Sequence, residues 1–212
     1  MIEQKKVILK QDIGINQRIP ISILELALLA ELQGNATSDY FRELVSTEYQ
    51  GQNRIGKAVT VMNRLTKKNP LMPYLMENKK HIEIMLRNKP DRTLLFTAVI
   101  CSAYVFGYDV VSLLGKYFHV QDIVTTDLIR QKMAEKYGSN RSLPNALYCI
   151  LPMLIEAQLL ERPESGVYKA IKVSKATEEA IDVYKQSFLL NNPTMTENDF
   201  IDTFPYFEFI IK

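Results

Sequence analysis

The chain has 212 residues and a formal net charge of only +2, from 26 lysines and arginines against 24 aspartates and glutamates. This length allows one domain or two small ones, and 47% hydrophobic residues are enough to form a core. Two separate cysteines, Cys101 and Cys149, exclude a disulfide scaffold, and no run reaches the about 20 apolar residues that a membrane helix needs. We expect both thiols to be buried and reduced.

The chain begins without the apolar core of a signal peptide, so we expect a cytoplasmic protein. Residues 6–13 are predicted to form a short strand or an arm. A proline before residues 21–32 and a glycine after them are typical helix punctuation. Thr37 or Ser38 can cap the next helix, which is predicted at residues 39–48.

Residues 52–68 are predicted to form an amphipathic helix with a basic stripe beside its apolar face. The stripe could be an ordinary solvated face, which most surface helices have, or a surface that follows a phosphate backbone. The apolar face consists of Ile55, Ala58, Val59, Met62 and Leu65, and the basic stripe of Arg54, Lys57, Arg64 and Lys68.

The distribution of charge along the chain favours the second interpretation. Residues 52–92 hold ten lysines and arginines and three acids, a local net charge of +7, while residues 176–212 hold two lysines and seven acids, a net charge of −5. Clustered cations release counterions when they meet a phosphate backbone. The segregation of charge therefore indicates a nucleic-acid partner, which the total charge does not.

The middle of the chain is also predicted to be helical. One helix has Pro73 in its first turn and runs to about residue 87, and residues 89–92 form a linker. A strongly apolar helix over residues 93–106 is expected at the centre of the core, interrupted by Gly107 and Tyr108. Asp109 would then cap a helix that ends at Phe118.

Residues 125–174 have the element order of a winged helix-turn-helix. One helix is predicted at residues 126–137, a break at residues 138–141, and a second, more apolar helix at residues 142–160. Two short extended runs around the turn Glu164-Ser165-Gly166 form a hairpin. This order resembles that of known DNA readers, which place the second helix in the major groove.

The start of this second helix is polar, as a groove-reading helix requires. Arginine can bridge guanine, asparagine can bridge adenine, and serine can bind a phosphate. Pro152 is expected to kink the helix, so packing against protein is the alternative role for this module. The candidate contacts are Asn140, Arg141, Ser142, Asn145 and Tyr148 at the helix start, with Arg162, Lys169 and Lys172 on the wing.

The carboxy-terminal region is first acidic and then aromatic. Residues 177–191 are predicted to form an acidic amphipathic helix, and residues 204–211 are strand-like. If the aromatic, strand-like segment were exposed, it would promote aggregation. We therefore expect it to dock, beside residues 6–13 or on a partner.

The sequence contains no recognisable catalytic constellation. His81 and His119 have no carboxylate or cysteine at ligand spacing, and the chain lacks the zinc, hydrolase and dinucleotide motifs. Its eight glycines are not clustered into a phosphate-binding loop. We expect no enzyme activity, no metal, no cofactor and no small-molecule substrate.

Several stretches occur in a suggestive order: an apolar helix at residues 23–34, Tyr40-Phe-Arg-Glu-Leu-Val45, the basic helix at residues 53–65, and Leu151-Pro-Met-Leu-Ile-Glu-Ala-Gln-Leu-Leu160 before a hairpin. This layout resembles the BrxA family of BREX phage-defence systems over about residues 20–190. Pro152 and Gln158 stand where a basic residue and a glycine are expected in that family. The resemblance implies a small, mostly helical protein that binds DNA.

The sequence therefore predicts a mainly α fold with a helical N-terminal part and a C-terminal winged helix-turn-helix bearing a small β-hairpin wing. Three regions are expected: residues 1–92 with the basic helix, residues 93–175 with the apolar helices and the winged module, and residues 176–212 with the acidic helix and aromatic tail. The expected function is non-catalytic binding of double-stranded DNA, in a BREX-type defence system with other defence proteins. The alternatives are a protein–protein scaffold subunit and a winged-helix transcription regulator.

Overall fold

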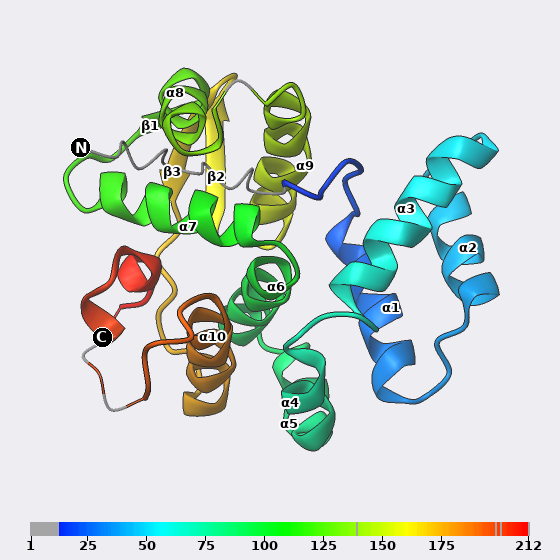
Figure 1. Ribbon diagram of the computed structural model, residues 1–212. Helices are drawn as coiled ribbons and strands as arrows, with labels where there is room; N and C mark the ends of the chain where they lie inside the picture. Colours follow the sequence, from blue (N-terminus) through cyan, green and yellow to red (C-terminus); the bar gives the residue numbers. More distant parts are fainter. Residues whose placement is uncertain (1–12, 139, 198, 200, 212) are drawn as a thin grey trace, which may run out of the picture.

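A computed structural model describes residues 13–138, 140–197, 199 and 201–211 of the chain (Figure 1). This described part contains ten α-helices, two short 3-10 helices and one small antiparallel sheet. The predicted mainly α fold with a small hairpin is therefore confirmed. The strand or arm predicted at residues 6–13 lies outside the described residues, apart from Ile13.

Three helices form the amino-terminal part, namely α1 (Ile21–Leu32), α2 (Ser38–Ser46) and α3 (Gln52–Leu65). The Thr37 hydroxyl caps α2 by accepting a hydrogen bond from the backbone N–H of Tyr40. α3 ends three residues earlier than predicted. The buried Asn69 side chain donates to the carbonyls of Leu65 and Val99, which fixes the end of α3 to the centre of the molecule.

The next segment differs from the predicted helix-and-linker arrangement. α4 (Met72–Glu77) and α5 (Lys79–Met85) replace the single helix expected over residues 73–87, because the backbone of Asn78 leaves the helical region. The linker expected at residues 89–92 is wrong, since these residues form the first turn of α6 (Lys89–Ala103). Pro90 suits that turn, where a backbone N–H has no partner within the helix.

α6 and α7 (Val105–Phe118) are separated at Tyr104, and the predicted interruption at Gly107 is wrong. Gly107 instead allows α7 to approach α6, because a Cβ atom there would lie 3.2 Å from an α6 side chain. The predicted role of Asp109 as the cap of α7 is also wrong, because this residue is buried inside the helix. It accepts hydrogen bonds of 2.6 Å from both Lys136 and Tyr137, which lie in α8 (Thr126–Tyr137), and so fastens α7 to α8.

The elements predicted for residues 125–174 follow α7 in the predicted order. β1 (Val124–Thr125), α8, α9 (Leu143–Glu156), β2 (Leu160–Glu164) and β3 (Val167–Ala170) are consecutive along the chain. β3 lies between β1 and β2 in the sheet, with Val124 opposite Tyr168 and Glu161 opposite Lys169. The helix, strand, helix, turn, helix and hairpin thus stand in winged-helix order, with β1 completing the sheet (Figure 1).

α9 is shorter than predicted, because Leu160 already belongs to β2. The connection uses Gln158, whose φ of 62° lies in the left-handed region that favours glycine. Its buried side-chain oxygen has no hydrogen-bond partner within the part of the chain that the structure describes. Gln158 therefore occupies a backbone position that glycine would adopt with less strain.

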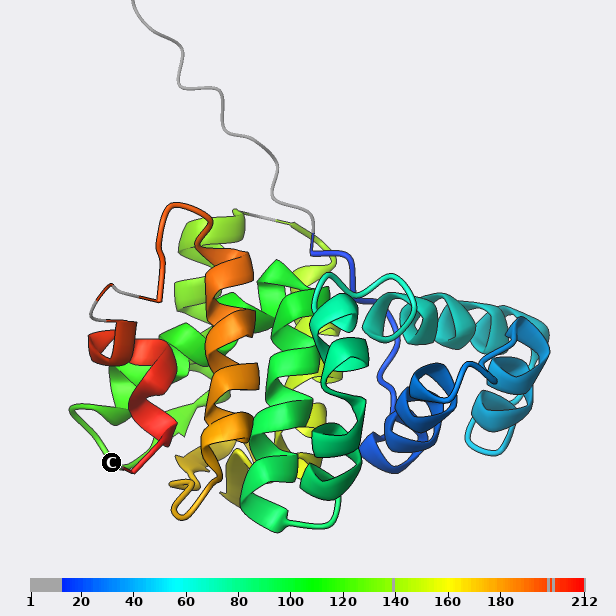
Figure 2. The same ribbon diagram turned by 90° about the horizontal axis from the view of Figure 1, so that it is seen from below.

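The acidic helix is confirmed as α10 (Glu178–Asn191), capped by the hydroxyl of Thr177, and it lies alongside α6 (Figure 2). The aromatic tail docks on the chain itself, but the predicted strand is wrong. Residues Ile201–Thr203 (η1) and Pro205–Phe209 (η2) form 3-10 helices, and only Ile210 makes an isolated bridge, to Val173.

The tail belongs to the core. Tyr206 and Phe209 have no exposed surface, and the Tyr206 ring stacks on that of Tyr184 with centroids 4.3 Å apart. η2 packs closely on α7 at Gly115, where a Cβ atom would lie 1.8 Å from the carbonyl oxygen of Pro205. The tail is therefore unavailable as a free aromatic docking segment.

Polar contacts join the three regions expected from the sequence. Glu156 at the end of α9 accepts a 2.8 Å hydrogen bond from the backbone N–H of Ile21 and pairs with Arg18. Asp91 in the first turn of α6 accepts a 2.8 Å hydrogen bond from the backbone N–H of Thr177. The boundary expected between residues 92 and 93 falls inside α6, so the first two regions share one continuous helix.

Candidate nucleic-acid interface

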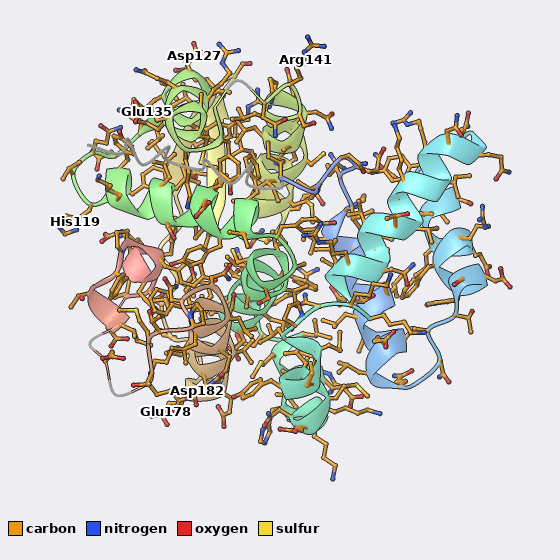
Figure 3. All side chains as sticks on the ribbon, viewed as in Figure 1. His119, Asp127, Glu135, Arg141, Glu178 and Asp182 are labelled. Carbon is orange, nitrogen blue, oxygen red and sulfur yellow. The ribbon has the colours of Figure 1, made fainter. Side chains whose placement is uncertain are left out.

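The start of α9 presents polar side chains to solvent, as the sequence predicts. Arg141, Ser142 and Asn145 are exposed, and Arg141 projects outward from the upper end of α9 in Figure 3. The side chain of Asn140 accepts a hydrogen bond from the backbone N–H of Ser142, which shapes the turn before the helix. The Asn145 amide donates to the carbonyl of Asn16 at 3.3 Å. This helix start can therefore meet a ligand from solvent.

A polar cavity of about 540 Å³ brings this helix start together with α3. Its walls are residues 13–16, the turn before α9, and Arg64, which reaches in from the end of α3. Two parts of the sequence with predicted phosphate contacts thus meet here, although they lie far apart along the chain. Asn140, Arg141, Ser142 and Asn145 all line the cavity.

Arg64 itself is engaged by the protein. Its Nε donates to the carbonyl of Ala103 at 3.0 Å, and its guanidinium lies 4.5 Å from the centre of the Tyr104 ring. The guanidinium also fills the space beside Gly14, where a Cβ atom would lie 2.4 Å from one of its nitrogens. The main role that this geometry gives Arg64 is to join α3 to the break between α6 and α7.

The other cations of the basic stripe are exposed. Arg54 and Lys57 lie in the first half of α3, and Arg54 stands 5.3 Å over the ring of Tyr49. Lys68 is exposed beyond the carboxyl end of the helix. Arg54, Lys57 and Arg141 form no ion pair with any residue in the described part of the chain. We use the name α3/α9 surface for the exposed candidate contacts on the first half of α3 and at the start of α9, which are Arg54, Lys57, Arg141, Ser142 and Asn145.

The wing is nearly neutral. Arg162 and Lys169 are balanced by Glu161 and Glu164 within the same hairpin, and Lys169 is only half exposed, with Glu161 opposite it in the sheet. Arg162 donates a 3.1 Å hydrogen bond to the hydroxyl of Ser165 at the turn. The wing therefore adds little net positive charge to the start of α9.

A smaller groove lies between α8, α9 and the wing. Tyr148 lines this groove and is 79% exposed, and Arg130 and Arg162 line it from α8 and the wing. Arg130 is not among the contacts predicted from the sequence, since nothing in its spacing connects it to α9. Pro152, which stays inside the continuous helix α9, also lines the groove.

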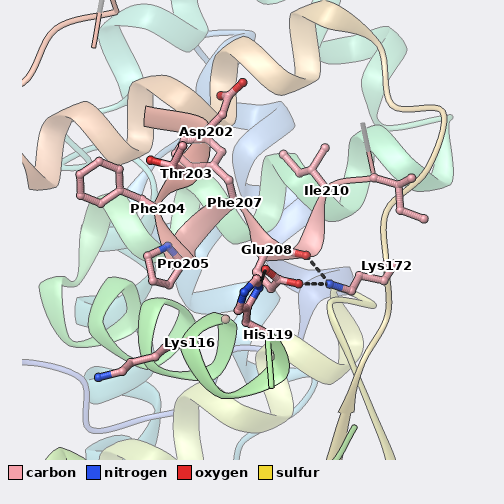
Figure 4. A pocket seen from close by; sticks show the side chains of 12 residues that line it. Lys116, His119, Lys172, Asp202, Thr203, Phe204, Pro205, Phe207, Glu208 and Ile210 are labelled. Atoms are coloured by element: carbon pink, nitrogen blue, oxygen red, sulfur yellow. Dashed lines mark hydrogen bonds and ion pairs between the residues drawn. The ribbon is translucent and has the colours of Figure 1, made fainter. Parts of the chain in front are cut away.

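Lys172 lies in a different environment from the other candidates. Its Nζ is 2.5 Å from the Glu208 carboxylate and donates a 2.6 Å hydrogen bond to the Glu208 carbonyl. On the other side of that carboxylate, Nδ1 of His119 lies 3.0 Å from Glu208 Oε2 (Figure 4). No carboxylate stands at ligand spacing from His119 in the sequence, and its partner Glu208 is 89 residues away along the chain.

These three side chains border a cavity of about 570 Å³ between α7 and the tail, which we name the tail pocket. Partial burial alone would raise the pKa of Glu208, but hydrogen bonds and charge from Lys172 and His119 outweigh burial and lower it. Lys172 is thus neutralised by the tail, and its ionic contact competes with any role in phosphate binding.

The other candidate reactive groups are structural. Burial raises the pKa of Cys101 to about 12 and that of Cys149 to about 11, so both are inert thiols, free and buried as predicted. Within the described ranges no three or more His, Cys, Asp or Glu side chains gather as a metal site, and no helix there has the length and apolar character to cross a membrane.

The chain matches no family model, no curated protein and no solved structure.

Proposed function

We propose that the protein binds double-stranded DNA without catalysing a reaction, through the α3/α9 surface. The observation that carries this proposal is the polar, solvent-facing start of α9 within a module of winged-helix order, since such modules read the major groove with that part of the helix. Arg54 and Lys57 add cations without carboxylate partners among the described residues, available for phosphates.

Phosphate contacts should supply most of the affinity. The neutral wing and the engaged side chains of Arg64 and Lys172 leave few cations for contact. Arg141 and Asn145 have the chemistry to bridge a base edge at the start of α9, whereas the Asn140 oxygen already accepts a hydrogen bond from Ser142. We therefore expect weak sequence preference and a marked dependence on salt. A role in a BREX-type phage-defence system, beside other defence proteins, is the biological setting that the BrxA resemblance implies.

The structure gives less support to the alternatives. A scaffold that binds partners through its aromatic tail needs exposed aromatic side chains, whereas Tyr206 and Phe209 are fully buried. A transcription regulator of winged-helix type predicts a two-fold dimer and a palindromic site. Sedimentation of the purified chain distinguishes the two hypotheses, because the regulator predicts a dimer whereas the proposed DNA binding requires only a monomer.

The test is a titration of fluorescent duplex DNA at several salt concentrations between about 50 and 200 mM. The Arg54→Ala/Lys57→Ala variant should reduce the slope of log K against log salt by up to about 1.8, since each phosphate that is no longer neutralised changes the slope by about 0.9, and Arg141→Ala should reduce it by about 0.9. Lys116→Ala is the matched control, because Lys116 is an exposed cation beside the tail pocket and should leave the slope unchanged. Absence of binding at low salt, or equal effects of all three variants, would overturn the proposal.

A further inference from the structure

The groove between α8, α9 and the wing has the shape of a small site with an apolar floor. Its floor is formed by Leu147, Leu151 and Tyr168, all of which are at most 5% exposed. Pro144 and Pro152 stand along α9 on its wall, and the enclosed volume is about 150 Å³. A cavity of this size suits one flat ring system and is too small for a folded element.

The rim of the groove holds an exposed aromatic side chain. The chain has 11 tyrosines and nine phenylalanines, yet Tyr148, at 79% exposure, is the only aromatic among the large apolar side chains that the described residues leave exposed. An exposed ring beside an apolar floor offers a face on which a planar ligand can stack. The other Tyr and Phe side chains of the described residues are buried or half-buried, so Tyr148 differs from them in its exposure.

Cations lie on two sides of the same rim. Arg130 comes from α8 and Arg162 from the wing, so both guanidinium groups flank the space beside Tyr148. Arg130 is paired with Asp127 at 2.9 Å, but the two side chains are 58% and 85% exposed, and such exposed pairs contribute little and exchange readily. Among the described residues, the polar contact of the Arg162 side chain is a neutral hydrogen bond to Ser165. Both can therefore turn towards phosphate groups.

We propose that this groove binds one unpaired nucleobase of a nucleic acid, stacked on Tyr148 above the apolar floor, with the flanking phosphates bound by Arg130 and Arg162. The proposal rests on the proposed DNA-binding function and adds that the protein prefers duplexes containing an unpaired base. The two arginines favour an anionic polymer over a neutral proline-rich peptide, which the apolar floor alone would also accept. A site of this kind gives little sequence preference, because every base has a face for stacking.

The experiment compares two fluorescently labelled duplexes that differ only in one position, which is either paired or carries an extra unpaired base. Wild-type protein should bind the second duplex more tightly. Tyr148→Ala should weaken binding to that duplex by about 5- to 150-fold, the range expected when one base no longer stacks on an aromatic ring, and should weaken binding to the paired duplex much less. Tyr148→Phe keeps the ring and should retain the preference.

A second readout follows the base directly. With 2-aminopurine as the unpaired base, wild-type protein and Tyr148→Phe should quench its fluorescence, and Tyr148→Ala should not. Because Tyr148 is exposed, the melting temperature of Tyr148→Ala should equal that of the wild type, which excludes misfolding as the cause.

The outcomes separate the two proposals. Salt-dependent binding with equal affinity for both duplexes, or with no effect of Tyr148→Ala on the unpaired-base duplex, overturns the assignment of this groove and leaves DNA binding intact. Binding of neither duplex at low salt overturns both. Capture of a proline-rich peptide with no preference for the unpaired base would also overturn the assignment.

Discussion

The α3/α9 surface and the tail pocket both contain cationic side chains, but the two regions use them differently. On the α3/α9 surface Arg54, Lys57 and Arg141 have no carboxylate partner among the described residues. At the tail pocket Lys172 and His119 share the carboxylate of Glu208. The Glu208 carboxylate of the aromatic tail thus engages Lys172 and His119, whereas the three cations of the α3/α9 surface have no such partner among the described residues. The availability of a cation for DNA depends on which remote segment packs beside it.

The largest expected effect concerns the close packing of η2 on α7 at Gly115. Gly115→Ala would place a Cβ atom 1.8 Å from the Pro205 carbonyl oxygen and 2.8 Å from its carbon, and backbone atoms cannot rotate away as a side chain can. We expect the free energy of unfolding to fall by about 3 kcal/mol, at the upper end for overpacking. Denaturant titration followed by circular dichroism measures this change.

Gly56 provides the matched control on the other region. It lies inside α3, and nothing is within 4 Å of the position that a Cβ atom would take. Gly56→Ala should therefore stabilise the protein by about 0.5–1 kcal/mol, because alanine loses less conformational freedom in a helix. Equal, small effects of the two substitutions would show that the tail is not packed on α7 as described.

Local sequence signals allow the order of helices and hairpin in residues 125–174 to be predicted. Thr125 and Thr177 cap helices where the pattern indicates that helices begin, and Gly166 turns the hairpin. The wrong predictions arise where one residue pattern is compatible with two different local conformations. A proline at the start of α6 resembles a linker, and an aromatic run resembles a strand until Pro205 and the burial of Tyr206 select a 3-10 helix.

The candidate site is only partly predictable for a different reason. Residue type identifies Arg141 and Asn145 as suitable contacts, and both are exposed. The same rule selects Arg64 and Lys172, whose partners lie far along the chain: Ala103 and Tyr104 for Arg64, and Glu208 for Lys172. No local pattern contains such long-range contacts.

A smaller expected effect concerns two positions where the backbone favours glycine, one on the tail side and one at the carboxyl end of α9. The tail side has a glycine where two backbones touch, whereas the end of α9 has Gln158 where a left-handed backbone favours one. Gln158→Gly should raise the free energy of unfolding by about 1 kcal/mol, since it relieves the strained φ of 62° and removes a buried oxygen without a partner. Gln186→Gly, in the middle of α10, should instead lower stability by about 1 kcal/mol.

The smallest expected effect tests whether the charge of Glu208 distinguishes the cations of the tail pocket from those of the α3/α9 surface. The pKa of Glu208 is lowered in the folded protein, so its ionic contacts stabilise the fold above the ordinary glutamate range and are lost as pH falls through the lowered pKa. Glu208→Gln should therefore reduce stability at pH 7 by less than about 1 kcal/mol, because His119 is largely exposed and Lys172 is 39% exposed. At about pH 3 the variant and the wild type should approach equal stability.

Denaturant titrations at the two pH values measure this difference, with Glu43→Gln as control, since Glu43 is exposed on α2 and makes no ion pair within the described part of the chain. If the Glu208→Gln difference persists undiminished at about pH 3, the carboxylate is not acting through its charge. Glu208→Gln should also leave the affinity for duplex DNA within about twofold, because freeing one cation at the tail pocket cannot add a contact to a surface formed by α3 and α9. A clear gain in affinity would place Lys172 within reach of the duplex and remove the distinction between the two regions.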